Sequence, residues 1–146
     1  MAAIIKTSID IEAPAEAVWS LISGIEDYAR WNPFVVSGKG DIREGAYIFL
    51  RAEPPGTRAM SFRSLVTKVA EGRELRWTGH FLVPGLVDGE HIHILEPLGP
   101  GRVRYIHDEV YTGILVPLIK RRLESVTREG FERMNLAASR AVQGKE

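Results

Sequence analysis

The chain has 146 residues, a length typical of one domain of roughly 100–200 residues, and we expect a single domain over 1–146. Its 19 Lys and Arg side chains balance 19 Asp and Glu, which argues against nucleic-acid binding and against a polybasic membrane anchor. There is no cysteine, so disulfides, thiolate metal sites and cysteine nucleophiles are excluded. The sequence shows neither a membrane-spanning apolar run nor a signal peptide, so we expect no membrane insertion and a cytoplasmic location.

The beginning of the chain predicts a strand followed by two short helices. Apolar and polar residues alternate over 5–11, which indicates a half-buried strand. Pro14 suits the first position of a helix that ends at Gly24. A second helical turn is expected over 26–30, before Pro33.

The middle of the chain, from 34 to 113, is typical of strands joined by short turns. Proline and glycine clusters punctuate it, because proline presets φ and glycine allows positive φ. Such a run predicts an antiparallel meander. The expected strands lie near 34–40, 46–53, 60–69, 74–81, 88–96 and 102–112.

The end of the chain predicts one long helix over 115–142. Apolar and small residues recur there at spacings of three and four, and Pro117 is acceptable only in the first turn. A run of strands followed by a helix implies an α+β domain with the helix on one face of the sheet. Because a large sheet twists and curls, we expect a cavity between the sheet and this helix.

Three segments resemble the SRPBCC superfamily of START-like domains, in its polyketide cyclase/dehydrase-like branch. They are the helix entry over 11–19 (IEAPAEAVW), the segment over 27–34 (DYARWNPF) and the strand over 75–79 (LRWTG). The resemblance implies a helix-grip fold: a curved seven-stranded antiparallel sheet, two short helices after the first strand, and a long C-terminal helix over a cavity. It implies a lipid- or polyketide-like hydrophobic or amphipathic ligand. It supplies no catalytic motif, and no cofactor is expected.

Pairing the last two strands gathers aromatic and histidine side chains on one face, because side chains alternate along a strand. A turn around Gly99 sets the predicted register. The predicted opposed pairs are Leu95 with Val103, His93 with Tyr105, His91 with His107 and Gly89 with Glu109, with Trp77 near His93 and Gly79 near His91. The face turned toward the helix would then carry Trp77, Gly79, His91, His93, Leu95, Tyr105, His107, Glu109 and Tyr111.

The histidines of this face, with Glu109, allow three interpretations. They are hydrogen-bonded core residues, the polar end of a ligand pocket, or ligands of zinc or non-haem iron. No complete metal motif is present, so no metal is assigned. If the protein is an enzyme, His107 and Glu109 are the candidate acid–base pair of a cyclase or dehydratase.

Two helix residues complete the predicted ligand-binding set. Gly130 lies on the apolar stripe of the helix, where it either leaves room for a ligand or allows close packing, and Met134 lies on the same stripe. We therefore predict binding of a hydrophobic or amphipathic small molecule. The alternatives are the cyclase or dehydratase and an interaction module that forms a homodimer through the apolar segment 81–87.

Overall fold

The computed structural model describes residues 2–144, which form a sheet, two helices and one 3-10 helix. Every expected element is present, with boundaries shifted by at most a few residues. In chain order they are β1 (Ala3–Ile11), α1 (Ala15–Ser23), η1 (Ile25–Arg30), β2 (Val35–Lys39), β3 (Tyr47–Ala52), β4 (Met60–Ala70), β5 (Glu74–Phe81), β6 (Val87–Gly99), β7 (Arg102–Thr112) and α2 (Val116–Val142).

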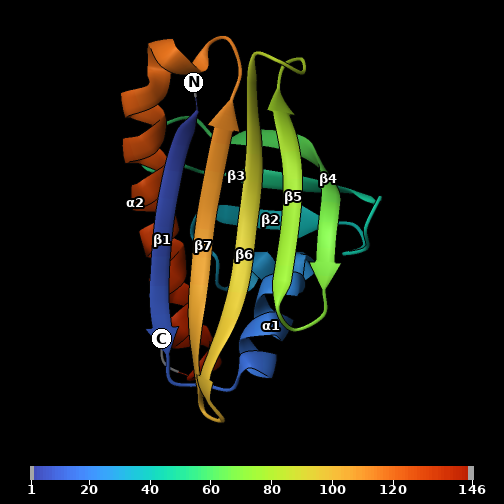
Figure 1. The fold of residues 1–146 in the computed structure, drawn as a ribbon, viewed down its shortest axis with the longest axis vertical. Coiled ribbons are helices and arrows are strands. Elements are labelled where there is room, and N and C mark those ends of the chain that lie inside the picture. Colours follow the sequence, from blue (N-terminus) through green and yellow to red (C-terminus); the bar gives the residue numbers. More distant parts are fainter. Residues whose placement is uncertain (1, 145–146) are drawn as a thin grey trace.

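The seven strands form one antiparallel sheet in the order β1-β7-β6-β5-β4-β3-β2. Figure 1 shows the sheet curling, so that β2 and β3 cross behind the long strands, while α2 runs alongside β1 and α1 lies near its C-terminal end. Pro117 falls in the first turn of α2, as the sequence requires. The predicted α+β helix-grip fold is thus confirmed.

The predicted register of the last hairpins is wrong by two residues. Leu95 pairs with Tyr105 and His93 with His107. Similarly, Trp77 pairs with His91 rather than lying near His93. The reason is that β6 continues to Gly99 before a tight turn, with an irregularity after Pro97, whereas the prediction placed a longer loop there.

The side chains that were predicted to share one face still do so, because a register shift of two residues keeps every side chain on its side of the sheet. Trp77, His93 and Tyr105 are almost completely buried, as are Leu95 and His107. These side chains lie on the concave face, where most of the main core cluster, including Ile11, Val66 and Phe131, also packs. The histidine face therefore belongs to the core side of the sheet, as predicted.

Gly130 lies where α2 packs tightly on the segment that precedes β2. A Cβ atom at this position would lie 2.5 Å from Cδ1 of Phe34. The ring of Phe34 in turn packs edge-on against Phe131. The structure therefore gives Gly130 the close-packing role, and the glycine lets the helix approach the aromatic ring.

Candidate functional site

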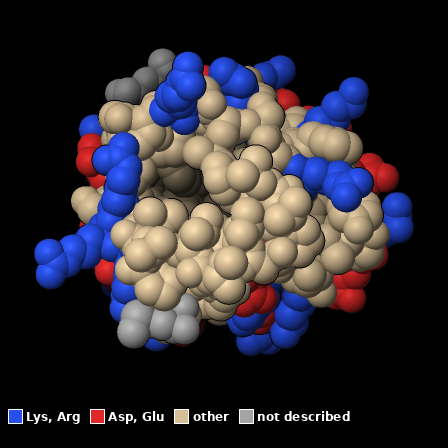
Figure 2. Space-filling model, turned by 90° about the horizontal axis from the view of Figure 1, so that it is seen from above, with Lys and Arg blue, Asp and Glu red and all other residues tan. Residues whose placement is uncertain are grey.

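A cavity of about 580 Å³ lies between the concave face of the sheet and α2. Its wall is largely apolar and comes from β3 to β7, from the segments that follow Asn32 and Ala52, and from the first three turns of α2. Figure 2 shows the end of the molecule that is uppermost in Figure 1, where uncharged residues surround a hollow and Lys and Arg side chains lie farther out. This end carries the β5–β6 and β7–α2 connections. The fold thus encloses a pocket that opens beside α2.

Five of the predicted ligand-binding residues line this cavity: Trp77, Gly79, His91, Glu109 and Tyr111.

The other six predicted residues lie in the core behind or beside the cavity wall. Leu95 packs in the main core cluster, and Tyr105 is buried against His93, with 2.6 Å between its hydroxyl and Nδ1 of that histidine. Met134 is buried, and its Sδ accepts a hydrogen bond from the Asn32 amide at 3.3 Å. His93, His107 and the tightly packed Gly130 complete this group.

Glu109 places a buried carboxyl group on the cavity wall. It is 7 % exposed, and burial raises the pKa of its carboxyl to about 8, with a smaller contribution from the nearby charge of Glu90. Its Oε2 lies directly over Gly89, where a Cβ would come within 2.5 Å of it. Glycine at this position therefore makes the space that the carboxyl group occupies.

A chain of side-chain contacts leads from Glu109 away from the cavity. His91 Nδ1 lies 3.6 Å from Oε1 of Glu109, and His91 Nε2 lies 2.6 Å from Nε2 of His107. His107 Nδ1 then lies 2.8 Å from Oδ1 of Asn135 on α2, and the Asn135 amide donates to Thr7 Oγ1 at 3.0 Å. Four elements, β7, β6, α2 and β1, thus meet in one buried polar row.

The histidines of this row are held neutral. Burial lowers the pKa of His107 to about 3, although its contact with Asn135 acts in the opposite direction. Burial, with a smaller contribution from His107, also lowers the pKa of His91 well below its usual value. The ring of Phe131 stacks on His107 with 3.7 Å between centroids, which covers the imidazole with apolar surface.

The metal interpretation requires three imidazoles whose lone pairs converge on one point. Potential ligand atoms of His91, His93 and His107 do lie within 4.8 Å of one another. However, Nε2 of His91 and Nε2 of His107 are only 2.6 Å apart and face each other across nearly parallel rings. Two nitrogens at roughly 2.0–2.1 Å from a tetrahedral zinc would stand farther apart, so this pair is arranged as a hydrogen bond.

Several important side chains carry no signal in the sequence. Ser64 on β4 lines the cavity and is 1 % exposed, and its Oγ has no hydrogen-bond partner among residues 2–144. Nε1 of Trp77 on β5, a residue predicted from the sequence, also has no hydrogen-bond partner among these residues. Asn135 lies on the buried stripe of α2, but its partners His107 and Thr7 are far away in sequence. Only the packed structure brings these groups together.

The apolar segment 81–87 borders the cavity. Phe81, Leu82 and Val87 line the cavity, and Leu82 is 79 % exposed. The backbone of Leu82 has φ of 66°, an unusual conformation for a residue with a branched side chain. The alternative role of this segment in a homodimer stays a prediction.

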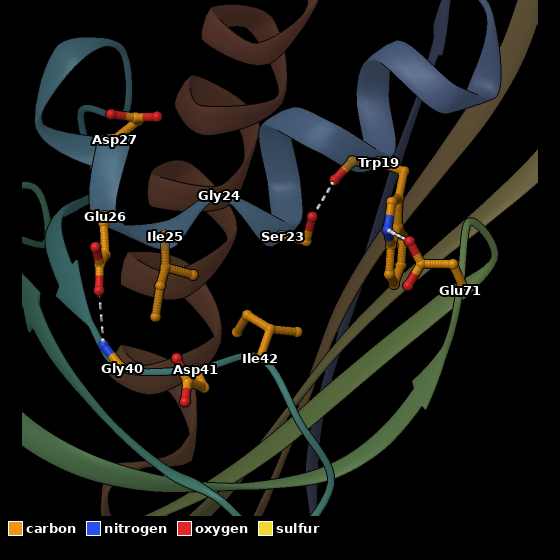
Figure 3. Close-up of a pocket in the computed structure, with 10 residues that line it drawn as sticks. All are labelled: Trp19, Ser23, Gly24, Ile25, Glu26, Asp27, Gly40, Asp41, Ile42 and Glu71. Atoms are coloured by element: carbon orange, nitrogen blue, oxygen red, sulfur yellow. Dashed lines mark hydrogen bonds between the residues drawn. The ribbon is translucent and has the colours of Figure 1, made fainter.

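A second hollow, of about 360 Å³, lies between α1, η1 and the connection from β2 to β3 (Figure 3). Its wall carries four exposed carboxylates, those of Glu26, Asp27, Asp41 and Glu71. Figure 3 shows Trp19 pointing its indole nitrogen at Glu71, a hydrogen bond of 3.1 Å. This hollow is polar and open, unlike the cavity beside α2.

Residues 2–139 match the family described as polyketide cyclase/dehydrase and lipid transport. The chain belongs to this family. That confirms the resemblance seen in the sequence, and members of this family bind small hydrophobic ligands. No curated protein sequence matches the chain. Within residues 2–144, none of the helices has the length and apolar character needed to cross a bilayer.

Solved structures with the same fold include two enzymes and one START protein. The Zhui aromatase/cyclase of Streptomyces sp. R1128 superposes with a TM-score of 0.81 at 13% identity, covering 98% of this chain and 94% of that one. A START superfamily protein of Mycobacterium smegmatis gives 0.77 at 21% identity, with 97% of each chain covered. Norcoclaurine synthase of Thalictrum flavum gives 0.76 at 14% identity, covering 99% and 96%. At these identities the likeness concerns the fold.

Proposed function

We propose that the protein binds a hydrophobic or amphipathic small molecule, lipid- or polyketide-like, in the cavity beside α2. The observation that carries this proposal is the cavity itself, whose largely apolar wall also presents the polar side chains of Glu109 and His91. Ser64 Oγ and Trp77 Nε1 lack a hydrogen-bond partner among the described residues, but both atoms are closed off from the interior of the cavity and do not count as ligand contacts.

The size and lining of the cavity support the same proposal. Its volume of about 580 Å³ falls in the range of roughly 300–1,000 Å³ that small-molecule sites occupy. Apolar side chains such as Phe62, Val87 and Leu123 provide the walls, while Glu109 adds a polar group. An apolar body with one or two polar substituents satisfies both kinds of surface.

A cavity-filling substitution on α2 tests the proposal. Val126 lines the cavity, so Val126→Trp should fill part of it and weaken binding of the neutral probe N-phenyl-1-naphthylamine by at least about ten-fold. Leu136→Trp, on the same helix at a position 52 % exposed, is the matched control and should leave the affinity unchanged. Fluorescence titration measures both. Equal affinity in the Val126→Trp protein and the wild type would contradict the proposal.

A second candidate function, cyclase or dehydratase chemistry, is favoured by the buried carboxyl of Glu109 on the cavity wall. The candidate pair needs one change: His107 lies behind the wall, whereas His91 lines the cavity and faces Glu109. The fold is shared with two proteins named as enzymes. If Glu109 acts as general acid or base, Glu109→Gln should lower turnover of a polyketone substrate by about 10² or more while binding persists.

A further inference from the structure

The buried polar row from Glu109 through Asn135 to Thr7 fixes which atom of each imidazole carries its proton. Thr7 Oγ1 donates to the main-chain carbonyl of His107 at 2.5 Å, so its oxygen accepts the Asn135 amide. That orients the Asn135 side chain, whose Oδ1 must face His107. Because an amide oxygen can only accept, Nδ1 of His107 is the protonated nitrogen.

The assignment continues through the two histidines. A neutral His107 that is protonated on Nδ1 has a lone pair on Nε2, so the close contact with His91 requires the proton on Nε2 of His91. Nδ1 of His91 then carries a lone pair, and this lone pair faces Oε1 of Glu109. A carboxylate in that place would set two acceptors against each other in a buried site.

We propose that Asn135 is a positioning residue that locks the His107–His91 pair in one tautomer and thereby makes Glu109 a hydrogen-bond donor toward the cavity. The inference rests on the proposed ligand-binding function and deepens it by naming the group that is recognised. That group is a neutral oxygen acceptor, such as a ketone or aldehyde carbonyl, on an apolar ligand. An ammonium group would need the ionised carboxylate instead.

The geometry leaves the Glu109 proton available to such a ligand. The distance of 3.6 Å to His91 Nδ1 is longer than a formed hydrogen bond, so the O–H group is not committed to the histidine. The carboxyl group lines the cavity above Gly89. The pKa of Glu109, raised to about 8 by burial, agrees with a protonated side chain at neutral pH.

The groups around Glu109 reinforce this state from each side. His91 on β6 is neutral, and Tyr111 on β7 is half-buried and uncharged, with its hydroxyl 2.8 Å from Thr127 Oγ1 on α2. Glu90 adds a negative charge from the opposite face of β6, which favours the protonated form. Arg122 on α2 also lines the cavity, but its side chain is exposed to solvent.

Nuclear magnetic resonance of the intact protein tests the lock directly. At pH 7 we expect the imidazole ¹⁵N shifts to show His107 protonated on Nδ1 and His91 protonated on Nε2, with the Glu109 carboxyl ¹³C shift that of the neutral acid. This reading needs no variant. His91 protonated on Nδ1, or Glu109 ionised at pH 6, would overturn the inference.

A variant of Asn135 tests its role as a positioning residue. Asn135→Leu removes the fixed acceptor, so both tautomers of His107 become accessible and Glu109 can ionise against a protonated Nδ1 of His91. The Glu109 pKa should fall by at least about one pH unit. Ser139→Ala, one turn along the same helix, should leave the Glu109 pKa where it is. An unchanged pKa in the Asn135→Leu protein would refute the positioning role.

A matched pair of probes tests the recognised group. 2-Acetylnaphthalene carries a ketone where 1-(2-naphthyl)ethylamine carries an ammonium group, on the same ring skeleton. At pH 6.5 the ketone should bind at least about ten-fold more tightly than the amine, and Glu109→Leu should lower the affinity for the ketone while the amine stays weakly bound. Tighter binding of the amine would overturn the inference but not the proposed function. Failure of both probes to bind would count against the proposed function. The tautomers of His91 and His107 measured by nuclear magnetic resonance would still test the positioning role of Asn135.

Discussion

The two hollows of the molecule show how burial changes what a carboxyl group does. The hollow beside α1 is surrounded by Glu26, Asp27, Asp41 and Glu71, all exposed to solvent. Among residues 2–144, the cavity beside α2 has one buried carboxyl in its wall, that of Glu109, whose pKa is raised to about 8. A solvated carboxylate keeps its charge at little cost, whereas a buried one retains its proton. The number of acidic groups is therefore a poorer guide to chemistry than their surroundings.

The largest effect on the pH dependence of stability is expected when the buried acid is removed by Glu109→Gln. Between the unfolded pKa of 4.5 and the folded value of about 8, the folded chain holds a proton on Glu109 that the unfolded chain has lost. The contribution of Glu109 to stability should therefore fall as pH rises through this window. Glu109→Gln should remove that fall, a difference of about 2 kcal/mol between pH 6.5 and 8 in urea unfolding.

The window above pH 6.5 is chosen because of the histidines. The pKa values of His91, His93 and His107 are all lowered from 6.5, so these residues stay neutral in the folded protein and reduce its stability as the pH falls through that value. Above pH 6.5 their contribution changes little and is the same in both proteins, so it cancels in the difference between the two stability profiles. Parallel stability profiles of the wild type and the Glu109→Gln protein over this window would contradict the assignment.

An effect of similar size is expected from the glycine that accommodates the acid. In Gly89→Ala the new methyl group would lie 2.5 Å from Glu109 Oε2 and 3.2 Å from the Tyr111 ring. Such overpacking should destabilise the protein by about 1–3 kcal/mol, and the variant should also displace the carboxyl group. Combining it with Glu109→Ala, which removes the opposing side chain, should recover part of the loss. No recovery in thermal unfolding would show that Tyr111 causes the strain.

The smallest effect is expected in the other hollow. Asp41 is exposed and its side chain makes no ion pair within the described part of the chain, so Asp41→Asn should change stability by less than about 0.5 kcal/mol. Its stability profile between pH 6.5 and 8 should run parallel to that of the wild type. A slope change like that of Glu109→Gln would remove the distinction between the two hollows.

The sequence allowed the fold and one wall of the cavity to be predicted, for a clear physical reason. Alternation along β6 and β7 depends only on local geometry, so His91, His93 and Glu109 could be placed on one face even though the register was wrong by two residues. The motifs that resemble the family indicated that the long C-terminal helix lies over the curved sheet. Both kinds of information lie in contiguous stretches of the chain.

The remainder of the site depends on packing between distant segments. Which residue of α2 meets His107 is decided by the rotation and height of the helix over the sheet, and apolar periodicity does not distinguish Asn135 from its neighbours on the buried stripe. Gly130 illustrates the same point, because its role depends on Phe34, almost a hundred residues earlier. Likewise Ser64 reaches the cavity only through the curl of the sheet.

The position of Asn135 between His107 and Thr7 in the polar row has a kinetic consequence. An amide has no acidic proton to pass on at neutral pH, so the row cannot conduct a proton from Glu109 to the solvent behind α2. The Glu109 proton must then exchange through the same opening that admits a ligand. A bound molecule would slow that exchange. The exchange rate of the Glu109 carboxyl proton would then report the residence time of the ligand.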